Sequence, residues 1–171
     1  MSSASNPSAV LPPPGAAAVA PSAGVERIFY DGHCALCHGM VKFVVARDKD
    51  GSKFRFAPLQ GSTFAALQAA AFISPAKSGA AGGGSGDVLA PESVLVLTRR
   101  GELLARSNGV IHVLRRMGGF WEFAGDAMAV FPRSIRDAVY NFVARVRYRV
   151  FGRRADLCPV MRPELRARFD D

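Results

Sequence analysis

The residues best suited to chemistry stand together near the start of the chain, in the stretch YDGHCALCH at residues 30–38. Two cysteines separated by two residues can form a disulfide with each other and exchange it with a substrate disulfide. The chain has three cysteines, and the third, Cys158, lies far along the sequence. A secreted domain held by several disulfides would carry more cysteines in spread pairs. The spacing of Cys34 and Cys37 therefore favours redox chemistry or metal binding.

The segments around this motif predict a strand followed by a helix. Residues 26–30 (ERIFY) are β-branched and aromatic, as in a strand, and apolar residues recur at helical spacing from Cys34 to about Arg47. Cys34 would then lie at a helix N-terminus, where free N–H groups and the helix dipole stabilise an anion. We expect its thiol pKa to fall below the usual value of about 8.5. Cys37, one turn later, is expected to be more buried and to keep its proton longer.

These positions predict a two-step exchange that needs no cofactor. The Cys34 thiolate attacks a substrate disulfide, and Cys37 then attacks Cys34 and releases the reduced substrate. Asp31 either caps the turn with Gly32 or accepts the proton of Cys37. A protonated His33 would stabilise the thiolate further.

The motif has three other interpretations. With His38 it matches a haem c attachment pattern, but the chain lacks the signal for export that haem attachment requires. Cys34 and Cys37 could bind zinc with His33 or His38 and Cys158, but structural zinc sites usually have two cysteine pairs and no second pair is present. Two buried core cysteines are the third interpretation, which the helix start at Cys34 disfavours. We therefore expect no metal.

Length and charge restrict the class of protein. The chain has 171 residues, enough for one domain, and a net charge of +8 that suits an anionic partner. It has no run of 18 apolar residues, so no transmembrane helix is expected. The N-terminus lacks lysine and arginine before Arg27, which matches neither a secretory signal nor a transit peptide. A cytoplasmic location is the prediction.

The order of elements predicts an α/β domain over residues 25–171, after a disordered Ala/Pro-rich tail at residues 1–24. A βαβ crossover followed by a ββα unit is the minimal thioredoxin-like arrangement: about four strands in a mixed sheet, the first two parallel, with helices on both faces. A glycine-rich stretch at about 74–90 predicts a flexible insertion. The predicted strands are 26–30, 54–57, 93–98 and 102–105, and the predicted helices are 34–47, 62–72, 108–117, 120–130 and 134–151.

A basic amphipathic helix at about 133–152 is added at the C-terminal end. Its apolar residues are expected to pack on the sheet while its arginines face water. Alternatively, it offers a surface for anionic membrane lipids or an acidic partner. Nucleic acid is not expected, because no binding motif is recognised. Cys158 is either an inert buried thiol or a third redox residue, and His112 is expected to be exposed.

The motif resembles the DCC family of thiol–disulfide oxidoreductases, which has the pattern Tyr-Asp-Gly-x-Cys-x-x-Cys. Here it stands at residues 30–37. The similarity extends over about residues 25–169. Further stretches that resemble the family are 54–60, 92–97, 136–140, 147–153 and 158–159.

The resemblance implies a thioredoxin-like fold and activity of the protein-disulfide reductase type. The substrate would be a disulfide-containing protein or a small thiol compound, and a separate reductant would recycle the dithiol. Thioredoxins place a cis-proline opposite their dithiol; here Pro91 is the nearest proline and Ser93 is expected at that position. Because that proline is missing, an alternative stays open: a non-catalytic binding module, associated with a membrane surface, whose dithiol senses redox state or binds zinc.

Overall fold

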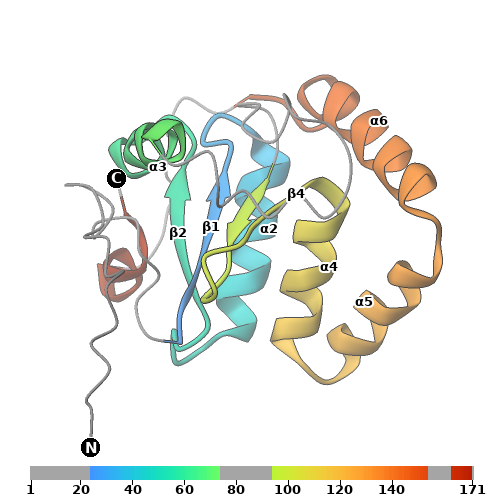
Figure 1. Ribbon diagram of the computed structural model, residues 1–171, viewed down its shortest axis with the longest axis horizontal. Helices are drawn as coiled ribbons and strands as arrows, with labels where there is room; N and C mark the ends of the chain where they lie inside the picture. Colours follow the sequence, from blue (N-terminus) through green and yellow to red (C-terminus); the bar gives the residue numbers. More distant parts are fainter. Residues whose placement is uncertain (1–23, 74–93, 154–162, 171) are drawn as a thin grey trace, which may run out of the picture.

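The computed structural model describes residues 24–73, 94–153 and 163–170 (Figure 1). The predicted tail at 1–24 and the glycine-rich insertion at 74–90 lie almost entirely outside these ranges. Pro91, Ser93 and Cys158 also lie outside the described residues.

Four strands form a mixed sheet in the order β2-β1-β3-β4. The central strand β1 (Glu26–Tyr30) pairs in parallel with β2 (Phe54–Pro58) and antiparallel with β3 (Leu95–Leu97). The hairpin partner of β3 is β4 (Leu103–Ala105). The predicted α/β class, the four-stranded mixed sheet and the parallel first pair are confirmed.

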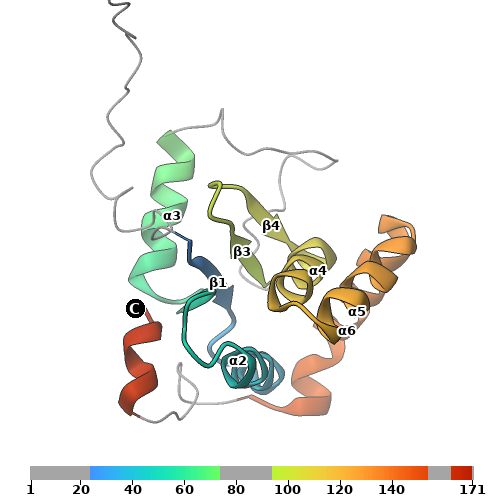
Figure 2. The same ribbon diagram turned by 90° about the horizontal axis from the view of Figure 1, so that it is seen from below.

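Helices cover both faces of this sheet, as predicted. In Figures 1 and 2, α2 and α4 lie on one face, α3 lies on the other, and α5 and α6 lie outside α4. The boundaries agree with the predicted helices to within about two residues, which is the usual uncertainty of helix ends. The helices are α2 (Ala35–Arg47), α3 (Ser62–Ile73), α4 (Arg106–Met117), α5 (Phe120–Val130) and α6 (Arg133–Phe151), with a short 3₁₀ helix η1 (Pro163–Arg168).

The core has two layers because successive strand side chains point to opposite faces of the sheet. Ile28 and Tyr30 of β1 pack towards α2, in a cluster with Val41 and Val44. Phe29, between them, packs on the other face in a cluster that includes Phe64 of α3. Strand β1 is thus buried on both faces, which explains why Ile28, Phe29 and Tyr30 follow one another without a polar residue between them.

Helix α6 departs from the sequence prediction: its apolar residues do not pack on the sheet. Val139 and Phe142 are 60% and 62% exposed. The reason is that α2 and α4 already cover this face of the sheet, so α6 contacts those helices through its opposite side. We call the exposed apolar side chains of α5, α6 and their connection the apolar face. Its members are Phe120, Phe123, Val130, Phe131, Ile135, Val139, Phe142, Val143, Val150 and Phe151.

His112 was predicted to be exposed, and this was wrong. Its side chain is half-buried, and Nε2 lies 2.8 Å from Oε2 of the buried Glu26 at the start of β1. Burial raises the pKa of Glu26, but the hydrogen bond and charge of His112, with the charge of Arg116, outweigh it and lower that pKa. The helix that carries His112 thus neutralises a buried carboxylate at the start of the central strand.

The C-terminal segment covers the β2 edge of the sheet, which sequence patterns did not predict. Phe169 forms an isolated parallel bridge with Phe56 and stacks on its ring, with the centroids 5.3 Å apart. Asp170 accepts hydrogen bonds from Arg27 at 2.9 Å and Arg55 at 2.6 Å. These contacts hold the end of the chain against β2.

Candidate active site

Cys34 is the N-cap residue of α2. Its backbone is extended (φ −95°, ψ 115°), and its Sγ accepts a hydrogen bond from the Cys37 backbone N–H at 3.4 Å. Its carbonyl oxygen accepts from the His38 N–H at 3.0 Å, so the helix begins directly after it. The sulfur therefore occupies the place where a helix N-terminus binds an anion.

The thiol of Cys34 is acidified. The hydrogen bond from the Cys37 thiol is the largest cause and lowers the pKa of Cys34 to about 6. The Cys37 backbone N–H and the positive charge of Arg147 act in the same direction, against burial and the negative charge of Asp31. The same pairing, together with burial, raises the pKa of Cys37. At neutral pH one proton is thus held on Cys37 while Cys34 is a thiolate.

Both cysteines are free thiols, and both are buried. Cys34 has 0% exposed surface and Cys37 has 5%, so exposure does not distinguish the two thiols, and the deeper burial of Cys37 stays a prediction. The chain after α6 accounts for this. Arg153 forms an antiparallel bridge with Cys34, and the Gly152 carbonyl lies 3.5 Å from the Ala35 nitrogen. The first turn of α2 is therefore covered by residues more than a hundred positions later in the sequence.

Asp31 is the polar centre of the site and is also buried. Its Oδ1 accepts hydrogen bonds from the His33 backbone N–H at 3.0 Å and from Gln60 Nε2 at 3.1 Å. The first of these is the turn-capping bond that the sequence led us to expect. Gln60 Oε1 accepts from the Gly32 backbone N–H at 3.0 Å, which ties the turn to the end of β2.

Sequence reasoning missed Arg147, which is the cation of the site. It is 3% exposed, and its Nη2 donates to Asp31 Oδ2 at 3.1 Å. The adjacent Tyr148 hydroxyl also donates to Asp31 Oδ2. The available signal was its position on α6: Tyr140, Ala144 and Arg147 share one side of the helix, next to the side that carries Val139 and Val143.

The two histidines of the motif have different surroundings. The side chain of His33, expected to stabilise the thiolate, is exposed. His38 is buried, with Nε2 2.6 Å from the Gly32 carbonyl oxygen, and its ring meets Tyr30 edge-on. Within residues 24–73, 94–153 and 163–170, no group of three or more His, Cys, Asp or Glu side chains is arranged to hold a metal. Cys158, part of the zinc alternative, lies outside these residues.

A pocket of about 330 Å³ opens beside the dithiol, and Cys37 forms part of its wall. Its lining is almost entirely apolar and comes from α2, α4, α5, α6 and Val94, just before β3. Arg147 also lines it. Other residues that line it are Leu36, Met40, Val110, Met128, Val139 and Val143.

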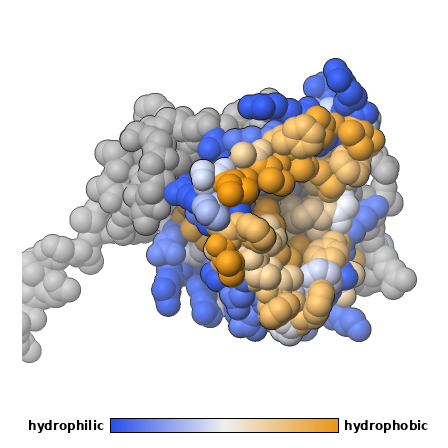
Figure 3. All heavy atoms as spheres, turned by 90° about the vertical axis from the view of Figure 1, so that its right-hand side faces the viewer, coloured by the Kyte–Doolittle hydropathy of each residue, from blue (hydrophilic) through white to orange (hydrophobic). Residues whose placement is uncertain are grey.

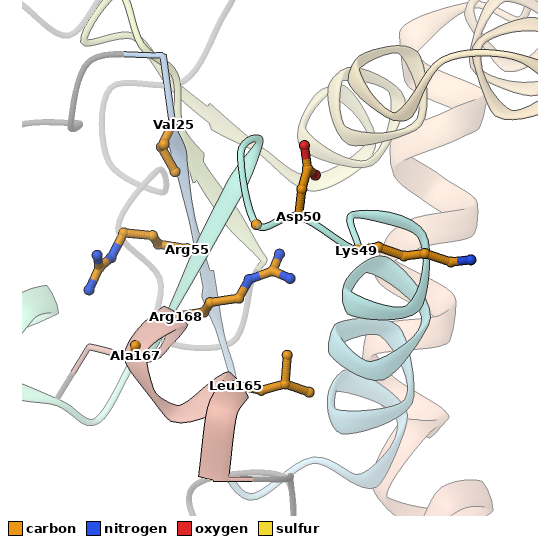
Figure 4. A pocket seen from close by; sticks show the side chains of 8 residues that line it. Val25, Lys49, Asp50, Arg55, Leu165, Ala167 and Arg168 are labelled. Atoms are coloured by element: carbon orange, nitrogen blue, oxygen red, sulfur yellow. The ribbon is translucent and has the colours of Figure 1, made fainter.

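A larger pocket, of about 410 Å³, shares no lining residue with the dithiol pocket. It lies between the turn after α2, strand β2 and η1 (Figure 4). Its arginines are already bound within the chain: Arg168 pairs with Asp48, and Arg55 pairs with Asp170. These pairs are structural, so we place the reactive site at the dithiol pocket.

A mixed four-stranded sheet between helices, with a reduced Cys-x-x-Cys at the start of the first described helix, defines a thioredoxin-like domain. The family described as DCC1-like thiol-disulfide oxidoreductase matches residues 28–153, which include Asp31, both cysteines of the motif and Arg147. The uncharacterized protein YuxK of Bacillus subtilis (strain 168) is 30% identical over 142 residues, 83% of this chain and 91% of YuxK. No solved structure matches significantly. The chain belongs to the DCC1-like thiol-disulfide oxidoreductase family.

None of the described helices is both long enough and apolar enough to cross a membrane.

Proposed function

We propose that this protein reduces disulfides of a protein or a small thiol compound, with Cys34 as nucleophile and Cys37 as resolving cysteine. The observation that carries the proposal is the Cys34 sulfur at the N-terminus of α2, with its pKa lowered to about 6. A thiolate is the reactive form in disulfide exchange, so this sulfur is ready to attack at neutral pH. A cytoplasmic location remains a prediction.

The first step forms a mixed disulfide. The Cys34 thiolate attacks one substrate sulfur, the substrate S–S bond breaks, and the leaving sulfur departs as a thiolate that takes a proton from water. The positive charge of Arg147 remains beside the sulfurs throughout, paired with Asp31. In the second step Cys37 gives up its proton and attacks the Cys34 sulfur. The substrate is released with both sulfurs reduced, and two electrons have passed from the dithiol to the substrate.

Proton removal from Cys37 is the demanding part of the second step, because its pKa is raised. Asp31 is the carboxylate whose charge acts on both thiols, and we assign it as the proton acceptor. Its four hydrogen bonds hold it in place before the reaction. A thiol reductant must then reduce the Cys34–Cys37 disulfide to complete the cycle.

Substrate access requires displacement of Arg153 from Cys34. An extended peptide that pairs with Cys34 in the same antiparallel manner would replace the backbone contact that Arg153 now makes. The apolar wall of the pocket beside Cys37 would accept an apolar side chain next to the substrate cysteine.

The test combines alkylation with trapping. The alkylation rate of reduced protein should rise with pH through a midpoint near 6 and then level off, because the rate follows the thiolate fraction of Cys34. Cys37→Ser should accumulate a mixed disulfide through Cys34 when mixed with an oxidised peptide, visible by mass spectrometry, and Cys34→Ser should accumulate none. A midpoint at the usual thiol value of about 8.5, with no trapped adduct, would contradict the proposal.

A further inference from the structure

The apolar face of α5 and α6 is the largest feature that the proposed chemistry leaves unused. Val130 at the end of α5 is 82% exposed, and phenylalanines of both helices stand out into solvent beside it. Figure 3 shows these side chains as one continuous apolar area with hydrophilic side chains at its margin. Such a contiguous exposed area marks an interaction surface.

Positive charge borders this face on α6. Arg145 and Arg149 are exposed and follow Phe142 by three and seven positions, so all three share one side of the helix. Two nearby acidic residues are paired within the chain, Asp137 with Arg133 at 3.3 Å and Asp126 with Arg115 at 2.7 Å, whereas Glu122 of α5 is exposed beside Phe123. Among the described residues no ion pair joins Arg145 or Arg149 to an acidic side chain, so the α6 side of the face carries their positive charge.

We propose that the apolar face docks on the surface of an anionic lipid bilayer. A bilayer offers an apolar layer for the phenylalanines and, a few ångströms outside it, negative headgroups for Arg145 and Arg149. A second copy of this chain would bring the same arginines towards each other and add repulsion to the contact. The charge of the border thus selects a negative, apolar partner.

Docking would also place the dithiol pocket next to the lipid. Val139 and Val143 belong both to the apolar face and to the pocket wall that holds Cys37. This consequence rests on the proposed exchange activity, whereas the docking itself does not. Substrates held at or near the bilayer would then meet the dithiol without diffusing through bulk water.

The experiment is co-sedimentation of the full chain with vesicles of phosphatidylglycerol and phosphatidylcholine, compared with phosphatidylcholine alone. We expect binding to the anionic vesicles that weakens as salt is added. Arg145→Ser with Arg149→Ser should weaken it by about fivefold for each arginine. Phe123→Ser with Phe142→Ser should weaken it by about tenfold for each phenylalanine. The matched control is Arg99→Ser with Arg100→Ser, the same charge change in the exposed β3–β4 turn.

Three results would overturn the proposal. The first is an absence of binding to anionic vesicles. The second is an equal loss in the Arg145/Arg149 variant and the Arg99/Arg100 control, which would mean that net charge alone drives adsorption. The third is a concentration-dependent dimer that the phenylalanine variant abolishes, which would assign the face to a second copy. Alkylation of Cys34 in the same variants reports separately on the exchange activity.

Discussion

Helices α2 and α6 have similar sequence patterns and opposite environments. Both have apolar residues at helical spacing, yet α2 buries them against the sheet while α6 exposes them. Helix α6 instead buries an arginine, which reaches the N-terminus of α2. Spacing identifies the residues that share a side of a helix, but the neighbouring elements decide which side is buried. Here α2 packs on the sheet, and α6 packs on α2 and α4.

The largest change in stability should come from substitution of Arg147, the buried arginine of α6 that pairs with Asp31. Arg147→Met leaves Asp31 buried without its cation, so we expect the free energy of unfolding to fall by about 3–5 kcal/mol. The same variant should move the alkylation midpoint of Cys34 upward from about 6, because a positive charge beside the thiolate is lost. Urea unfolding and the pH dependence of alkylation measure the two changes.

The control for Arg147 is Arg145→Met, two positions away on the same helix but exposed. It should change the free energy of unfolding by no more than about 0.5 kcal/mol and leave the alkylation midpoint in place. Equal effects of the two substitutions would mean that Arg147 contributes only general positive charge.

A smaller change in the free energy of unfolding should distinguish a buried apolar residue of α2 from an exposed one of α6. Val44 of α2 is 1% exposed, whereas Val139 of α6 belongs to the apolar face. Val44→Ala should lower the free energy of unfolding by about 2 kcal/mol, through lost burial and the cavity left behind. Val139→Ala should change it by less than about 0.5 kcal/mol. Chemical denaturation of both variants measures this, and a large cost at Val139 would show that α6 packs there in solution.

The smallest expected changes in the free energy of unfolding come from glycine-to-alanine substitutions, and they should have opposite signs in α2 and at the end of α6. Gly39 lies inside α2 on its exposed side, and an added Cβ would meet nothing within 4 Å. Gly39→Ala should therefore raise the free energy of unfolding by about 0.5–1 kcal/mol. Gly152 ends α6 at φ +76°, so Gly152→Ala should lower it by about 1 kcal/mol.

Thermal unfolding of the Gly39 and Gly152 variants measures whether each substitution stabilises or destabilises the protein. A stabilising Gly152→Ala would mean that the chain beside Cys34 leaves α6 with a different backbone conformation. The same variant should then also change the access of alkylating reagents to Cys34.

Local sequence determined most of the elements and the position of the dithiol. Ile28, Phe29 and Tyr30 are β-branched or aromatic, the turn at Asp31 and Gly32 follows, and helical spacing starts at Cys34. Strand, turn and helix N-terminus depend on residues close in sequence, so their order and the predicted anion-stabilising position of Cys34 follow from propensity and pattern. The predicted four-stranded sheet follows in the same way from the order of strands and helices.

Only the tertiary structure decided what surrounds the dithiol and what remains exposed. Arg147 and Arg153 meet Asp31 and Cys34 across more than a hundred positions, and the C-terminal Phe169 lies against β2. Such contacts depend on which surfaces stay exposed after the sheet and its first helices have packed. Local sequence patterns do not predict which surfaces these are. For the same reason the apolar residues of α6, which sequence alone assigned to the core, form an exposed surface.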